Sequence, residues 1–207
     1  MKFLYKSLAI FGLAALVLAP EAKAAEPLEG KTIYIDAGHG GSDSGAVGNG
    51  LFEKNINLAV SNDVMDKLKN EGATAVASRT DDTFLSLEER VAKASMNGSD
   101  LFVSIHANSG VSSASGTETY FNSDYEAENS ERLAADIQNE LVPALDTTDR
   151  GVKEAEFYVI TYSQMPSVLA ELGFITNSSD AEKLNSGQYQ EKAADAIVGG
   201  IETYYAK

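Results

Sequence analysis

Residues 31–41, with the sequence KTIYIDAGHGG, hold the pattern from which the fold of this chain can be predicted. Residues 31–36 are rich in β-branched and aromatic side chains and predict a strand. Glycines then flank His39 on both sides. Because glycine tolerates sharp turns and close backbone contacts, a histidine in this setting can be brought near a ligand. A glycine-rich phosphate loop is the competing interpretation, and no Gly-Lys-Ser/Thr or GxGxxG pattern supports it.

Strands and helices are predicted to alternate along the rest of the chain. Residues 53–70 place Ile56, Val60, Val64 and Leu68 at four-residue spacing, which predicts a helix with one buried face. Further strands are expected at residues 73–79, 100–106, 117–122, 156–161 and 168–174. Further helices are expected at residues 86–97, 126–141 and 188–205, the first of them with a capping box. This order predicts one α/β domain whose ligands lie beyond the carboxyl ends of strands.

The N-terminal residues resemble an export signal. Lys2 and Lys6 precede an apolar run over residues 8–19, followed by Ala22-Lys23-Ala24. The run is about a dozen residues long, short of the ~20 that a membrane-spanning helix needs. We therefore expect a signal peptide at residues 1–24 and a single secreted domain at residues 25–207.

The composition excludes several kinds of partner. The chain of 207 residues has a formal charge of −15 and no cysteine. Nucleic acids and anionic lipids are polyanions, so this charge argues against both as the main partner. Without cysteine there is no disulfide framework and no lipid-attachment site. We expect no membrane association after signal cleavage, and a monomer.

The two histidines of the chain, His39 and His106, both lie at predicted strand ends. Each alone could be a hydrogen-bonded structural residue, but two at neighbouring strand ends favour a metal site. A catalytic zinc ion takes three protein ligands from His, Asp and Glu and keeps one position open. Glu53 opens the predicted helix on its inward side and could supply the carboxylate, although an acidic residue in a first helical turn more commonly serves the helix dipole.

Glu171 is a single carboxylate in the apolar run LAELGF, residues 169–174. A buried unpaired charge is costly, so this side chain should meet a cation or stay near neutrality through a raised pKa. Either outcome suits a general base. The alternative is a glutamate at a strand edge that reaches solvent.

The motifs together resemble the zinc-dependent N-acetylmuramoyl-L-alanine amidases of the amidase 3 family. They are the DAGHGG run at residues 36–41, Glu53-Lys54, SIHAN at residues 104–108, GTETY at residues 116–120 and ELGFITN at residues 171–177. Five motifs in this order are specific, whereas each alone would be weak. The resemblance implies one Zn²⁺ held by His39, Glu53 and His106, with Glu171 as catalytic acid/base. It also implies a mixed, mostly parallel twisted sheet of about six strands with helices on both faces.

The resemblance further implies hydrolysis of the amide bond between N-acetylmuramic acid and L-alanine in peptidoglycan. A zinc-bound water would attack and Glu171 would transfer the proton. The expected location is outside the cell, in the cell wall or periplasm. Glu118 and Arg150 also lie in segments resembling the family, and we expect only a strand-face glutamate and a solvated arginine. A wall-binding scaffold without activity, or a peptidase acting within the stem peptide, remain the rival functions.

Overall fold

The computed structural model describes residues 27–207, so the expected signal peptide at residues 1–24 lies outside the described part. The strands are β1 (Thr32–Ala37), β2 (Val47–Gly48), β3 (Leu51–Phe52), β4 (Thr74–Ala77), β5 (Leu101–Asn108), β6 (Thr117–Phe121), β7 (Asp149–Glu154) and β8 (Ser167–Phe174). The helices are α1 (Glu53–Asn70), α2 (Leu87–Met96), α3 (Ala127–Leu145), α4 (Tyr158–Thr161), α5 (Ser178–Leu184) and α6 (Gly187–Tyr205). None of the helices within residues 27–207 combines the length and apolarity needed to cross a membrane.

Six strands form the main sheet, in the order β4-β1-β5-β8-β6-β7. The first four are mutually parallel, β6 runs antiparallel to β8, and β7 is parallel to β6. The predicted mixed, mostly parallel sheet is confirmed. β2 and β3 form a separate two-stranded hairpin just before α1.

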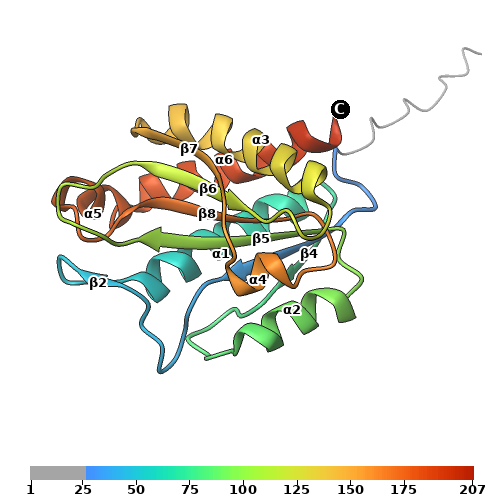
Figure 1. The fold of residues 1–207 in the computed structure, drawn as a ribbon, viewed down its shortest axis with the longest axis horizontal. Coiled ribbons are helices and arrows are strands. Elements are labelled where there is room, and N and C mark those ends of the chain that lie inside the picture. The colour runs from blue at the N-terminus through green and yellow to red at the C-terminus, as the bar shows by residue number, and fades with distance from the viewer. Residues whose placement is uncertain (1–26) are drawn as a thin grey trace, which may run out of the picture.

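The two faces of the sheet differ in how they are covered (Figure 1). Helices α1, α3 and α6 cover one face, where alternate residues such as Ile35, Val103 and Ala170 form the larger core. Helices α2 and α4 lie against the other face over a smaller cluster that includes Tyr34, Phe102 and Leu169. Because strand side chains alternate between faces, the same strands also present polar residues toward the α2 and α4 side.

Local sequence signals set most helix boundaries. α1 begins at Glu53 and buries Ile56, Val60, Val64 and Leu68, as their spacing predicts. α2 begins after the capping box formed by Ser86 and Glu89. Both helices, and most of α3 and α6, agree with the sequence-based expectation.

One expected strand is wrong. Residues 156–161 contain the short helix α4, and the strand in this part of the chain is β7, which the sequence did not suggest. The aromatic and β-branched run favours a strand locally, but Val159 and Ile160 gain more by packing in the smaller core as helix residues. β7 lies at the sheet edge and is largely polar, so it lacks the apolar pattern of an interior strand.

Candidate active site

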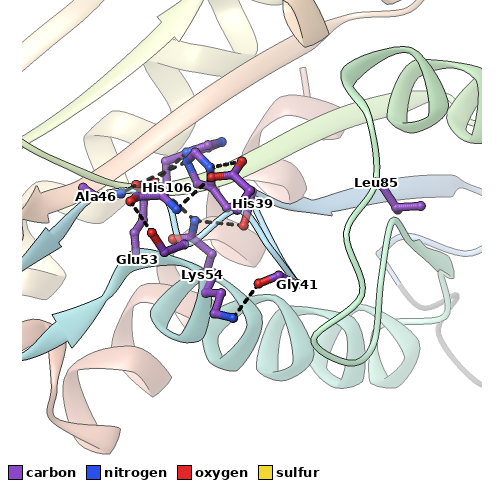
Figure 2. Close-up of polar contacts among 12 residues, drawn as sticks. His39, Gly41, Ala46, Glu53, Lys54, Leu85 and His106 are labelled. Carbon is purple, nitrogen blue, oxygen red and sulfur yellow. Dashed lines mark hydrogen bonds and ion pairs between the residues drawn. The ribbon is translucent and has the colours of Figure 1, made fainter.

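His39, Glu53 and His106 lie together, although they come from three separate elements. His39 follows β1, Glu53 is the first residue of α1, and His106 lies within β5. One potential ligand atom from each falls within 4.8 Å of the others. Glu53 bridges the two rings, with its Oε1 2.7 Å from His106 Nδ1 and its Oε2 3.2 Å from His39 Nε2. Figure 2 shows Glu53 rising from α1 toward both histidines.

Hydrogen bonds fix these three side chains. The backbone N–H of Ala46 donates to Glu53 Oε2 at 2.7 Å, and that of Ala107 donates to Oε1 at 3.2 Å. Burial raises the pKa of Glu53, but its hydrogen bonds with His106 and His39 outweigh burial and hold the pKa well below the ordinary value. His39 Nδ1 lies 2.7 Å from Asp43 Oδ2. This contact orients the ring so that Nε2 faces Glu53.

Two glycines leave the room that the cluster needs. A Cβ atom on Gly38 would lie 2.3 Å from His106 Nε2, and one on Gly45 would lie 2.6 Å from Glu53 Oε2. Both distances are far below a van der Waals contact. The glycines around the motif therefore let the backbone approach the functional side chains, as the sequence predicted for the His39 loop.

Two buried arginines, which sequence reasoning missed, hold the loop that carries His39. Arg79 donates from Nε to the carbonyl of Ala37 at 3.0 Å and from Nη2 to that of Gly38 at 2.9 Å. Arg90, from α2, donates from Nη2 to the carbonyl of His39 at 2.7 Å and pairs with Asp36 at 2.6 Å. The sequence offered a signal only for Arg90, a charged residue on the apolar side of the helix predicted at residues 86–97.

Glu171 lies beside the cluster on the neighbouring strand. It is paired in register with His106 across β5 and β8, so both side chains project from the same sheet face. The residue is only 9% exposed, and its Oε2 has no hydrogen-bond partner within residues 27–207. Burial raises the pKa of Glu171 well above its ordinary value, and the carboxylates of Glu53 and Glu118 add to the rise. Glu171 is thus buried, as its apolar neighbours predicted, and burial favours its protonated form.

A cleft of about 510 Å³ brings these residues to one surface. His39, Glu53, His106 and Glu171 all line it. Much of its lining is apolar and comes from the start of α2, from α4 and from the residues just before each helix, namely Phe84, Leu85, Leu87, Phe157, Tyr158 and Val159. The lining also includes the polar residues Asn108, the last residue of β5, and Ser109.

Glu118 and Arg150 are more than the strand-face glutamate and solvated arginine expected from the sequence. Glu118 is 2% exposed and is in register with Glu171 across β6 and β8. Arg150 donates from Nε to Glu118 Oε2 at 2.7 Å. The sequence could not reveal this pair, because β7, which carries Arg150, lacked a strand pattern.

The donor set suits a metal ion with an open coordination position. Two imidazoles and one ionised carboxylate are ligands that zinc prefers at catalytic sites. The unpartnered Oε2 of Glu171 beside them is the kind of buried polar atom that a bound reactant would satisfy. The residues therefore fit a mononuclear zinc hydrolase.

Comparisons with known proteins identify the family of this chain. The model of the N-acetylmuramoyl-L-alanine amidase family matches residues 33–203. The chain is 77% identical to the uncharacterized protein YqiI of Bacillus subtilis (strain 168), over 99% of both chains. It is 56% identical to the N-acetylmuramoyl-L-alanine amidase LytC of the same organism, over 86% of this chain but only 36% of LytC.

Solved structures give the same result. The N-acetylmuramoyl-L-alanine amidase of Clostridium difficile 630 superposes with a TM-score of 0.82 at 35% identity, over 86% of this chain and 97% of that one. The catalytic domain of CwlV from Bacillus (Paenibacillus) polymyxa var. colistinus gives a TM-score of 0.79 at 41% identity, over 84% and 97% of the two chains. The chain therefore belongs to the N-acetylmuramoyl-L-alanine amidase family. This membership confirms the enzyme class that the sequence motifs predicted.

Proposed function

We propose that this chain hydrolyses the amide bond between N-acetylmuramic acid and L-alanine in peptidoglycan, with one Zn²⁺ held by His39, Glu53 and His106. The observation that carries the proposal is the position of Glu171. Its buried, unpartnered carboxyl oxygen lies on the strand next to His106 and faces the cleft that His39 and Glu53 also line. Family membership supports the bond and the substrate.

Each protein group then has a definite task. A bound zinc ion supplies positive charge that acidifies water and polarises a carbonyl group. Glu171 accepts the proton of the attacking water and passes it to the amine of L-alanine as the bond breaks. Its raised pKa suits a group that must hold a proton between these two transfers. Asp43 keeps the His39 ring oriented, and the backbone N–H groups of Ala46 and Ala107 orient Glu53.

The activity is tested on purified peptidoglycan with residues 25–207. Release of new N-terminal alanine, followed by amine labelling and mass spectrometry, should stop with a chelator and return with zinc. Release of terminal D-amino acids instead would indicate a peptidase of the stem peptide. Binding without release, in protein shown to hold zinc, would favour the wall-binding scaffold.

The role of Glu171 is tested by Glu171→Gln. This variant should keep zinc and lose roughly 10²–10⁴-fold in turnover, the usual contribution of a general acid/base. Glu131→Gln, an exposed position on α3, is the matched control and should behave as wild type. Wild-type turnover in Glu171→Gln would remove Glu171 from the mechanism, whereas loss of zinc would make it a ligand.

We further propose that residues 1–24 direct export and that the mature protein acts as a monomer in the cell wall or periplasm. The apolar run at residues 8–19 after two lysines supports export, and one relative, LytH of Staphylococcus aureus, is named a probable cell wall amidase. N-terminal sequencing of the secreted protein should begin at Ala25. Sedimentation should give the mass of one chain.

A further inference from the structure

A buried carboxylate next to Glu171 gathers two cations at one side of the active site. Glu118 Oε1 accepts hydrogen bonds from Asn108 Nδ2 and the Tyr120 hydroxyl, each at 2.7 Å. Its Oε2 accepts from Arg150 Nε at 2.7 Å and from Lys153 Nζ. Asn108 also lines the cleft, so this cluster adjoins the space in front of Glu171.

The cluster carries a net positive charge in a strongly acidic protein. Burial raises the pKa of Glu118, but hydrogen bonds from Lys153, Tyr120 and Arg150 outweigh burial and lower it, so the carboxylate stays ionised. One carboxylate thus faces two cations, in a chain with a formal charge of −15. The side chain of Glu118 is 3% exposed, whereas those of Arg150 and Lys153 are 32% and 38% exposed. The positive charges are therefore accessible to a ligand and the negative charge is not.

The geometry of Arg150 leaves donors for a second anion. Its contact with Glu118 uses Nε, and its only other side-chain hydrogen bond within residues 27–207 is a long one, 3.4 Å from Nη1 to the carbonyl of Ser115. The guanidinium lies over the ring of Phe174, with Cζ 4.7 Å from the centroid. A planar fork held in place on an aromatic ring is well suited to bind a carboxylate.

We propose that Arg150 and Lys153 form a subsite for a free carboxylate in the peptide part of the substrate. The inference rests on the proposed amidase function. In that substrate the lactyl carboxyl group of the muramic acid is consumed in the scissile amide, so the N-acetylated glycan is neutral near the cleavage point. The free carboxylates belong to the stem peptide, and the exposed cations beside Glu171 match them in charge.

The subsite also gives the direction in which the substrate lies. The part of the cleft formed before and at the start of α2 carries the exposed apolar side chains of Phe84 and Leu87, which are 49% and 50% exposed. Apolar and aromatic surfaces suit the faces of sugar rings better than a charged peptide. We therefore expect the glycan to lie toward α2 and the peptide to cross β8 toward β6 and β7.

The test compares two synthetic muramoyl dipeptides that differ only in the α-group of the second residue, muramoyl-L-alanyl-D-glutamate with a carboxylate and muramoyl-L-alanyl-D-isoglutamine with a carboxamide. We expect the wild type to prefer the carboxylate roughly tenfold in kcat/KM, as a charge-assisted contact predicts. In Arg150→Gln/Lys153→Gln the ratio of the two kcat/KM values should fall to near one, mainly through KM. Lys192→Gln, an exposed lysine on α6, is the matched control and should keep the preference.

A salt titration of the wild type keeps the proposal testable if the double variant folds poorly. The preference for the carboxylate should shrink as added salt screens the contact. Equal kcat/KM values for the two substrates in the wild type, or an equal loss on both in the double variant, would overturn the subsite.

Failure of the proposed function would look different, because zinc-loaded wild type would then release alanine from neither substrate. In that case, calorimetric titration of the zinc-loaded protein with L-alanyl-D-glutamate and with L-alanyl-D-isoglutamine measures the affinity of the subsite for each dipeptide. Tighter binding of the first would support it, and equal affinities would overturn it.

Discussion

His39 occupies a backbone conformation that costs free energy. Its φ angle is 62°, in the left-handed region that residues other than glycine seldom adopt. The arginine contacts to the carbonyls of Ala37, Gly38 and His39 supply the compensating interactions. These contacts hold the backbone of this proposed zinc ligand in one conformation.

Gly38→Ala tests how tightly this loop is packed. The new Cβ would meet the His106 ring at 2.3 Å, so the ring must move or the loop must shift. We expect zinc content to fall and activity to drop by roughly 100-fold, the usual effect of misplacing a reactive group by about 1 Å. Gly187→Ala is the control, since a Cβ there meets nothing within 4 Å. Metal analysis and alanine release measure both effects, and an unchanged Gly38→Ala protein would contradict the close packing.

Glu171 should make the stability of the metal-free protein depend on pH. Burial, then Glu53 and Glu118, raise its pKa above the ordinary 4.5, so above that pH the folded state binds more protons than the unfolded chain. Its contribution to stability is present at low pH and is lost as the pH rises toward the folded pKa. In chelator at about pH 8, the Tm of Glu171→Gln should exceed that of wild type by several degrees, at ~2–4 °C per kcal/mol. Thermal unfolding from about pH 4.5 to 8 should show the gap widening; a constant gap would refute the assignment.

At the scale of elements, α2 stabilises the active-site loop rather than the larger core. Arg90 on α2 is 2% exposed and makes a 2.6 Å ion pair with Asp36 of β1. Ser104 of β5 donates to the other carboxylate oxygen at 2.8 Å. The Asp36 carboxylate thus links the end of β1 to α2 through Arg90 and to β5 through Ser104.

Arg90→Met should therefore destabilise the protein strongly. It leaves Asp36 as a buried charge with one hydroxyl partner, and breaking a buried ion pair in this way costs about 3–5 kcal/mol. Met96→Ala, at an 85% exposed position on the same helix, should change stability by less than about 0.5 kcal/mol. Urea unfolding compares the two. Similar midpoints for Arg90→Met and wild type would show that the pair contributes little.

The sequence predicted the helices and strands that have regularly spaced apolar residues, and it missed the features that depend on contacts between distant parts of the chain. α1 and the strands β1, β5 and β8 carry enough apolar residues at regular spacing to be recognised, and with them came His39, Glu53, His106 and Glu171. β7 is an edge strand with polar side chains, and α4 has a strand-like composition. Arg79, Arg90 and Glu118 act through partners distant in the chain, which local patterns do not reveal.

For the whole molecule, zinc should act as a cross-link between segments far apart in the chain. Its proposed ligands lie at positions 39, 53 and 106, after β1, in α1 and in β5. A ligand that binds only the folded state adds about 4 kcal/mol at 1,000 times its Kd.

Removing zinc with a chelator should therefore lower Tm by about 8–16 °C, at ~2–4 °C per kcal/mol. Differential scanning calorimetry measures the change, and added zinc should reverse it. The Tm of Glu53→Gln should fall far less when the chelator is added, because this variant has a weakened zinc ligand and binds less zinc. An equal response in both proteins would mean that the metal stabilises the fold elsewhere.

The alignment of His106, Glu171 and Glu118 across β5, β8 and β6 has an evolutionary consequence. Their separation follows the spacing of hydrogen-bonded strands, about 4.8 Å, and not the lengths of the connecting segments. Insertions near Phe84 or Ser109 can reshape the walls of the cleft and leave that separation intact. An insertion of a single residue within β8 would instead turn Glu171 to the opposite face. Changes in the loops can thus alter substrate preference, while the sheet backbone keeps the spacing of His106, Glu171 and Glu118 constant.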